Sequence, residues 1–330
     1  MDITGTAGDT ARLDVYLWND PDSIPTDPNY QLSKDLISTV AYFDISPYCR
    51  EFIAHQSFTA VGSGQTAAAV GEYCYCTTKE YLNGSLVGGG TSEFTCFEGY
   101  GYFEDGYNDL VPAVMLAEGE YYVKESSNSG SIYIYSEGNT WDVTWTGLTS
   151  GGTTSLTTLN NTLVHVPMLH SNYQGEGNSL NIARVGGGAS FDYTITEVCE
   201  PKYTPVEVDF VNKYGVWQRL VFFKVKKDSI NINTTEYKMY PSSINYSTSD
   251  NITQRFNTNA TQKTTLNTGF VREGYSEVIQ QLMLSEKVLL DGVPVNVDTK
   301  SVEKFTHIND NNINYKIDFL HSYNLINYVL

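Results

Sequence analysis

Residues 206–225 read VEVDFVNKYGVWQRLVFFKV, and this stretch decides the fold class of the chain. Val206–Val211 and Val216–Val225 are dominated by β-branched and aromatic residues, which favour strands. Asn212–Gly215 between them is a four-residue turn that contains a glycine. Two such runs joined by a short Gly-containing turn predict a β-hairpin.

The composition extends this β prediction to the whole chain. The 330 residues include 25 Tyr, 14 Phe and 4 Trp, and only 18% of the chain is charged. Abundant aromatics and few charges are typical of β-sheets, and 41% hydrophobic residues suffice for a large core. We therefore expect a mainly β protein.

A domain boundary is predicted immediately before the hairpin. Glu200–Pro205 contains two prolines, which favour an extended connector. Residues 1–200 hold 6 Lys and Arg against 25 Asp and Glu, whereas residues 201–330 hold 14 against 13. The predicted domains are an acidic region 1–200 and a β-rich domain 201–330.

The acidic region is expected to form one β-sandwich, or two small ones divided near residues 80–95. Its short strand-like runs lie between clusters of Gly, Asn, Asp, Pro and Ser. A single helical segment is expected, where Ser46 would cap a turn or two over Tyr48–Ile53. The predicted strands are Arg12–Trp18, Val40–Ile45, Val70–Thr77, Glu93–Phe97, Glu120–Lys124, Ser131–Tyr135, Trp141–Trp145, Leu163–Met168 and Phe191–Val198.

The second domain is predicted to carry one amphipathic helix near residues 275–285. Tyr275, Val278, Ile279 and Leu282 recur at i, i+3, i+4 and i+7, which gives one apolar face. The remaining predicted strands are Tyr237–Tyr240, Thr253–Asn257, Lys287–Leu290, Val293–Val297, Val302–His307 and Asn314–Leu320.

Net charge and hydropathy exclude several classes of partner. A net charge of −18 argues against nucleic acid, because phosphate binding needs clustered Lys and Arg. No apolar run approaches the roughly 20 residues of a membrane-spanning helix. The start, MDITGTAGDTARLD, lacks the basic and apolar regions of a secretory signal.

The five cysteines are expected to be buried structural residues. They are Cys49, Cys74, Cys76, Cys96 and Cys199, an odd and scattered set that is unlike a disulfide scaffold and is typical of a reducing compartment. Cys74 and Cys76 are two residues apart, so on a strand they share a face. The paired C-x-x-C or H-x-x-x-H spacing of zinc sites is absent, so no metal site is predicted.

The histidines and potential nucleophiles offer no catalytic motif. The five histidines (His55, His165, His170, His307 and His321) are far apart in the sequence, and His165 lies within an apolar strand. No G-x-S-x-G elbow or H-E-x-x-H motif occurs. We predict no enzymatic activity, no catalytic residue and no cofactor site.

Acidic and aromatic residues near position 100 leave three weaker alternatives. Glu104 and Asp105, or Asp20 and Asp22, are candidates for glycoside hydrolysis, but adjacent carboxylates on a strand point to opposite faces. Asp105, Asn108 and Asp109 are a candidate calcium loop that lacks the EF-hand order. The four aromatics of this segment are expected in the core or a subunit interface, with sugar stacking as the alternative: Tyr100, Tyr102, Phe103 and Tyr107.

Segments near both ends of the chain carry a resemblance to a known family. They are Tyr16-Leu17-Trp18, Tyr30-Gln31-Leu32, Phe43-Asp44-Ile45-Ser46, Leu266–Val271, Glu277–Glu286, Pro294–Val297 and Lys316–Phe319. With these segments both ends resemble structural proteins of tailed bacteriophages, whereas about 60–200 does not. The closing region is similar to a group of phage tail or baseplate-associated proteins.

The resemblance implies a virion protein that is made in the bacterial cytoplasm. We expect a tail, baseplate or neck connector, or a fibre-attachment protein. Such a protein would assemble with copies of itself in a ring or other closed oligomer, and with other virion proteins. The alternative is a carbohydrate-binding, adhesin-like β-sandwich that recognises a host surface. A tail-associated depolymerase is the least favoured function.

Overall fold

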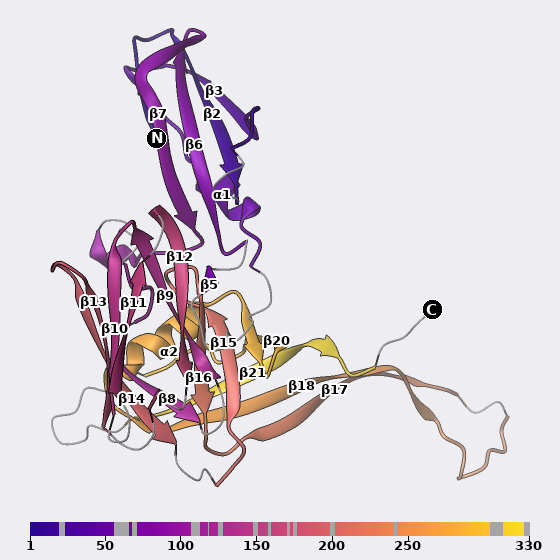
Figure 1. Ribbon diagram of the computed structural model, residues 1–330. Helices are drawn as coiled ribbons and strands as arrows, with labels where there is room; N and C mark the ends of the chain where they lie inside the picture. Colours follow the sequence, from indigo (N-terminus) through magenta and orange to yellow (C-terminus); the bar gives the residue numbers. More distant parts are fainter. Residues whose placement is uncertain are drawn as a thin grey trace. The chain divides into compact units, whose positions relative to one another are not determined.

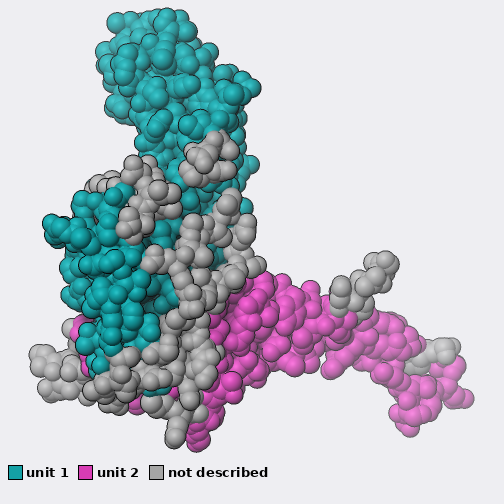
Figure 2. Space-filling view, viewed as in Figure 1, with its two compact units in different colours: residues 1–197, 211–218 teal, residues 198–210, 219–330 magenta. Residues whose placement is uncertain are grey.

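The computed structural model confirms a mainly β chain with two α-helices among the described residues (Figure 1). It describes residues 1–19, 24–55, 66–67, 71–106, 113–117, 119–124, 128–147, 151–157, 160–169, 172–173, 177–198, 202–240, 243–303 and 313–326. The chain divides into two compact units, coloured teal and magenta in Figure 2. Unit 1 is Met1–Glu197 with Val211–Gln218, and unit 2 is Val198–Phe210 with Arg219–Leu330.

Unit 1 begins with an antiparallel four-stranded sheet in the order β3-β2-β6-β7. A two-stranded ribbon, β1–β4, and the short helix α1 add buried residues to the same core, including Ile3, Phe43 and Ile53. The elements are β1 (Asp2–Thr4), β2 (Thr10–Trp18), β3 (Tyr30–Asp35), β4 (Val40–Tyr42), α1 (Ser46–Phe52), β6 (Tyr73–Leu82) and β7 (Ser85–Phe97).

The predicted capping of α1 is wrong in detail. The cap position is Ile45, one residue earlier than Ser46. The Asp44 carboxylate instead accepts a hydrogen bond of 3.0 Å from the Ser46 backbone N–H. This bond satisfies one of the free N–H groups at the helix start. Hydrogen bonds from the Ser46 side chain and then from its backbone lower the pKa of Asp44.

Residues 80–95, where a division of the acidic region was considered, lie in the β6–β7 hairpin. Tyr73 pairs with Phe97 and Leu82 pairs with Ser85, so a boundary there would cut one hairpin. The run Gly88–Gly90 lies inside β7.

The rest of unit 1 forms two further sheets that are sandwich-like. One has five strands in the order β11-β10-β13-β14-β8, and the other has three in the order β5-β12-β9. Burial alternates at the start of β10, where Trp141 and Val143 are buried, whereas Ser131, Ile132, Tyr133 and Ile134 on β9 are all buried. The strands are β5 (Thr66–Ala67), β8 (Gly119–Lys124), β9 (Asn128–Glu137), β10 (Thr140–Thr146), β11 (Gly151–Thr157), β12 (Asn160–Leu169), β13 (Asn178–Arg184) and β14 (Ser190–Val198).

The predicted hairpin at 206–225 is present as β15 (Val206–Val211) and β16 (Trp217–Phe222). Its turn is closed by a 2.9 Å hydrogen bond from the Asn212 N–H to the Val216 carbonyl, with Gly215 at a φ of 81°. Val211–Gln218, the end of the hairpin, belongs to unit 1, whereas most of both strands belongs to unit 2.

Unit 2 is built on an antiparallel seven-stranded sheet in the order β16-β15-β19-β20-β21-β18-β17. Its helix α2 (Tyr275–Leu284) confirms the predicted amphipathic helix, because all four residues of the predicted apolar face are buried. The remaining strands are β17 (Lys227–Lys238), β18 (Thr253–Val271), β19 (Val288–Leu290), β20 (Val293–Val297) and β21 (Ile313–Asn324).

Two predictions in unit 2 need comment. The strands predicted at Tyr237–Tyr240 and Thr253–Asn257 are parts of β17 and β18, which are far longer than expected. Val302 and Glu303 are not in a strand, and the rest of the predicted strand Val302–His307 lies outside the described residues.

A buried ion pair links β15 and β16. The Arg219 guanidinium donates to both carboxylate oxygens of Asp209, at 2.6 and 2.9 Å, and its third nitrogen lies 2.8 Å from Glu207. Burial raises the pKa of Asp209, although the hydrogen bonds from Arg219 act in the opposite direction. The pair is therefore a polar element inside a mostly apolar sheet.

Candidate functional site

The most exposed feature of unit 2 is the outer part of the β17–β18 hairpin. Figure 1 shows these strands continuing past the end of β21. The pairing of β18 with β21 ends at Thr261 and Asn324, whereas its pairing with β17 continues to Thr253 and Lys238. We define the arm as the described residues of 227–260.

The arm carries apolar side chains that are open to solvent. Ile230 and Ile232 are 60% and 65% exposed near its base. Farther out, the rings of Tyr237 and Phe256 meet edge to face at 5.6 Å on the surface. The other exposed apolar residues of the arm are Met239, Tyr240, Ile244, Tyr246 and Ile252.

β17 is also an edge strand. It is the last strand in the order of the seven-stranded sheet, and in the described part of the chain no strand pairs with its outer side. An edge strand offers backbone N–H and C=O groups to another chain, and native proteins usually protect such edges with charges or prolines. β17 carries charges near both ends, at Lys227, Asp228, Glu236 and Lys238, but its middle, which holds Ile230 and Ile232, has neither a charge nor a proline.

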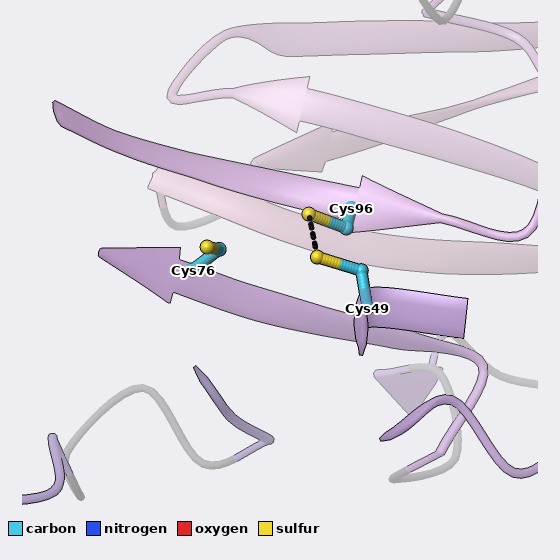
Figure 3. Close-up of side chains that lie close together, drawn as sticks. All are labelled: Cys49, Cys76 and Cys96. Carbon is cyan, nitrogen blue, oxygen red and sulfur yellow. Dashed lines mark hydrogen bonds between the residues drawn. The ribbon is translucent and has the colours of Figure 1, made fainter. Parts of the chain in front are cut away.

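A second feature is a group of four cysteines in the core of unit 1. Figure 3 shows that Cys49 on α1, Cys76 on β6 and Cys96 on β7 lie close together. Their three sulfur atoms all lie within 4.8 Å of one another, and the Cys96 and Cys49 Sγ atoms are 3.4 Å apart. Cys74 shares the face of Cys76 and pairs across the hairpin with Cys96.

Hydrogen bonding within the group shifts the pKa values of three of the thiols. Bonds from Cys74, Cys76 and Cys96 lower the pKa of the Cys49 thiol, whereas the bonds to Cys49 and Cys96 raise those of Cys74 and Cys76. Cys49, Cys74 and Cys76 are buried, as predicted, and Cys96 is partly exposed. Cys199 lies outside the described residues.

The convergence of these cysteines was missed because their spacing in sequence shows only the Cys74–Cys76 pair. A signal was present in the Asn83-Gly84 dipeptide, which favours a tight hairpin turn and so brings two cysteine-bearing segments together. Cys49 could not be added, since nothing local places a separate helix over that hairpin.

The acidic and aromatic candidates near residue 100 lie on the surface. Phe103–Asp105 forms a single 3-10 turn, η1, in which Phe103 is fully exposed and both carboxylates face solvent. Phe103 is therefore outside the core of the chain, contrary to a core assignment. Asp20, Asp22, Tyr107, Asn108 and Asp109 lie outside the described residues.

This turn follows a segment that contacts the β15–β16 hairpin end within unit 1. The Tyr100 N–H donates to the Lys213 carbonyl at 2.8 Å. The Lys213 ammonium lies 5.2 Å from the ring centroid of Tyr102, a cation–π distance. These contacts fix Tyr100 and Tyr102 against the hairpin end. The exposed Phe103 follows directly after these two fixed residues.

The three described histidines occupy separate, packed positions. His165 is buried and stacks on Tyr133 with ring centroids 5.2 Å apart. His321 is buried with its Nε2 3.1 Å from the Thr264 hydroxyl. His55 lies 2.9 Å from the Glu98 carboxylate. His170 and His307 lie outside the described residues.

Glu72 is a buried carboxyl that the sequence analysis did not single out. It precedes β6, is 5% exposed, and accepts a 3.5 Å hydrogen bond from the Tyr133 hydroxyl. Burial raises the pKa of Glu72 to about 7, with the Tyr133 bond acting in the opposite direction. Nothing in a single acidic residue before a strand predicts such burial.

Taken together, these features define a β-rich chain with an exposed apolar edge and a buried thiol group. No known protein family, curated protein or solved structure matches this chain. Among the described residues, no helix is long and apolar enough to cross a bilayer.

Proposed function

We propose that this chain is a structural component of a phage virion, a tail, baseplate or neck connector or a fibre-attachment protein, and that it works by assembly through the arm. The observation that supports the proposal is the exposed arm. Isolated exposed apolar residues are ordinary, but a series of them along one edge hairpin is typical of an interaction surface.

The proposed occupant of the β17 edge is a neighbouring copy of the same chain. The charges of the arm are nearly balanced, and Glu236 and Arg255 pair with each other at 2.9 Å. The arm therefore offers little attraction to a strongly charged partner, whereas apolar contact with backbone pairing suits another β-sheet. Each copy has one β17 edge and one arm. The same contact between neighbouring copies can therefore repeat until the copies close into a ring.

The test is the solution mass of the full chain by light scattering, together with negative-stain images of the same sample. We expect a fixed multiple of 36.8 kDa and discrete closed particles. The variant Ile230→Thr/Ile232→Thr keeps β-branched residues in β17 but removes apolar surface, and its mass should shift toward the monomer.

Ile37→Thr is the matched control, since it changes an isoleucine that is 97% exposed outside the arm. This control should keep the mass of the unchanged protein. A monomer at every concentration tested, or an unaltered multimer in the double variant, would contradict assembly through the arm.

The exposed Phe103 favours a second candidate function, recognition of a host-surface carbohydrate. A free aromatic ring beside the carboxylates of Glu104 and Asp105 is a suitable surface for stacking on a sugar. A glycan array should then show binding that Phe103→Ala removes and Ile37→Thr leaves intact. Absence of any bound glycan would count against this function and leave the assembly proposal untouched.

A further inference from the structure

The cysteine group of unit 1 combines features that a merely packed set of cysteines does not need. Cys49, Cys76 and Cys96 come from three separate elements, α1, β6 and β7, and their sulfur atoms all lie within 4.8 Å of one another (Figure 3). A free cysteine in a core behaves as a small apolar residue, and nothing in packing requires three sulfur atoms from three elements to meet beside a fourth cysteine.

We propose that Cys49, Cys74, Cys76 and Cys96 form a binding site for one Zn²⁺ ion. Each residue would supply one thiolate sulfur, which gives the four-sulfur set found in structural zinc sites. The site would join α1 to the β6–β7 hairpin, in addition to their packing in a shared core and to the ion pair of Arg50 on α1 with Glu98, which follows β7.

The sulfur positions are close to those that a tetrahedral ion requires. A Zn–S distance of about 2.3 Å corresponds to sulfur atoms about 3.8 Å apart. The Cys49 and Cys96 sulfurs are 3.4 Å apart, and those of Cys49, Cys76 and Cys96 all lie within 4.8 Å. Cys74 pairs with Cys96 across the hairpin and lies two residues from Cys76 on the same face of β6, so it stands next to these three sulfurs. The proposed site requires the Cys74 side chain to turn toward them.

The donor atoms select the kind of metal. Thiolates are soft ligands that favour zinc or copper(I), whereas calcium and magnesium require oxygen ligands. Apolar side chains that include Val15, Leu17 and Ile53 belong to the same core as the cysteines. Four sulfur ligands in a tetrahedral arrangement are typical of Zn²⁺ in structural sites. Cys96 is partly exposed, so an ion could reach the group from solvent.

The competing use of the same sulfurs is a disulfide. Cys49 and Cys96 are near enough for one, and Cys74 faces Cys96 directly across the hairpin. A disulfide would use two of the four cysteines and would give no reason for the other two to converge. Zinc uses the whole set, and a reducing cytoplasm is the setting in which clustered cysteines more often bind metal.

The experiment titrates the full chain, purified with reductant and then made metal-free, with Zn²⁺ and separately with Co²⁺. We expect about one equivalent of either ion per chain. Co²⁺ should give the strong visible absorption of a tetrahedral site and a near-ultraviolet sulfur-to-metal charge-transfer band. Both bands should disappear when one equivalent of Zn²⁺ is added.

Single Cys→Ser variants locate the ligands. Cys76→Ser and Cys96→Ser should lower Zn²⁺ affinity by at least about 100-fold and change the Co²⁺ spectrum, because each removes a thiolate. Cys199→Ser, which alters the one cysteine outside the group, should behave like the unchanged chain. Circular dichroism of each metal-free variant checks that it keeps its β-sheet content.

Several results would overturn the proposal. They are binding of less than half an equivalent of Zn²⁺ by the reduced chain, a Co²⁺ spectrum without charge transfer, binding of copper(I) but not Zn²⁺, and equal loss of affinity in Cys199→Ser. A disulfide between two of the four cysteines in protein purified under reducing conditions would also overturn it.

Discussion

Glu72 is a case in which burial alone changes the chemistry of a residue. Its one described hydrogen bond, from Tyr133, is long at 3.5 Å and does little to stabilise a charge. The carboxyl therefore keeps its proton in the folded chain up to a pH near 7. Folding thus binds a proton in a range where the unfolded carboxyl, with a pKa near 4.5, has lost it.

The stability of unit 1 should consequently depend on pH. Because the pKa of Glu72 is raised in the folded chain, its contribution to the free energy of unfolding should be greatest below pH 4.5. This contribution should fall between about pH 4.5 and pH 7 and stay constant above pH 7. The expected change is roughly 3 kcal/mol. Urea denaturation across this pH range measures it.

The variant Glu72→Gln isolates this effect. It keeps the shape of the side chain without a titrating proton, so its stability curve should be flatter than that of the unchanged chain by about the same amount. Glu104→Gln, at an exposed carboxylate, should leave the pH dependence as it was. Parallel curves for Glu72→Gln and the unchanged chain would refute the assignment.

Arg219 stabilises unit 2 because it neutralises a carboxylate that has little access to water. We expect Arg219→Ala to lower the free energy of unfolding by roughly 3 to 5 kcal/mol, since it leaves Asp209 buried without its partner. The double variant Asp209→Leu/Arg219→Met should be less destabilised than the single one. Urea unfolding of both decides the matter, and a loss below about 1 kcal/mol in Arg219→Ala would count against it.

At the scale of single elements, the β6–β7 hairpin shows what a sequence pattern can and cannot predict. Asn83 and Gly84 both have positive φ, as the tight turn of an Asn-Gly hairpin requires. Near the turn, Tyr81 pairs with Leu86, but beyond the glycine run Lys79 pairs with Thr91. Three extra residues in β7 shift the register.

This shift decides which cysteines meet. Continued without interruption, the register at the turn would place Glu93 opposite Cys74, whereas the shifted register places Cys96 there. An odd shift also exchanges the two faces of β7. Helix α2 could be predicted, because the periodic spacing of its apolar residues indicates its apolar face. The cysteine group could not be predicted, because it depends on an irregularity inside β7.

The turn of the β15–β16 hairpin gives a prediction for a single element. Gly215 has a φ of 81°, and a Cβ there would lie 2.7 Å from backbone atoms of Glu98. Backbone atoms cannot yield as a flexible side chain can, so Gly215→Ala should destabilise unit 1 by more than about 2 kcal/mol. Thermal unfolding followed by circular dichroism measures this loss.

Gly186→Ala is the matched control for that change. Gly186 also has a positive φ, at 94°, but a Cβ there would meet no atom within 4 Å. It should lose only the roughly 1 kcal/mol that a left-handed conformation costs a residue with a side chain. Equal losses in the two variants would show that the approach to Glu98 is unimportant.

At the scale of the whole molecule, the division into units does not follow the chain. The fold class and the change of composition near residue 200 were readable from sequence. The return of Val211–Gln218 to unit 1 was not, since it rests on contacts between distant segments. Within that unit Asn212 donates to the Met115 carbonyl at 3.0 Å, and Gln218 donates to the Tyr121 hydroxyl at 3.3 Å.

A fragment of residues 1–197 should therefore be less stable than one of residues 1–218. The shorter fragment leaves the Met115 carbonyl and the Tyr121 hydroxyl without these two donors, and each lost buried bond costs about 1 to 3 kcal/mol. The urea midpoint of unit 1, followed by fluorescence, should be lower for the shorter fragment. Identical midpoints would mean that the hairpin end contributes nothing to this unit.

The same hairpin also sets an order of events on the ribosome. Unit 1 lacks a part of itself until residue 218 has been synthesised, although its other residues end at 197. Unit 1 of the nascent chain therefore cannot finish folding until the first strand of unit 2 has been made. Until then, Met115 and Tyr121 lack their hydrogen bonds to the hairpin end. Such a pause leaves strand edges open to neighbouring nascent chains, which makes slow translation near residues 198–218 a point at which newly made copies would misassemble.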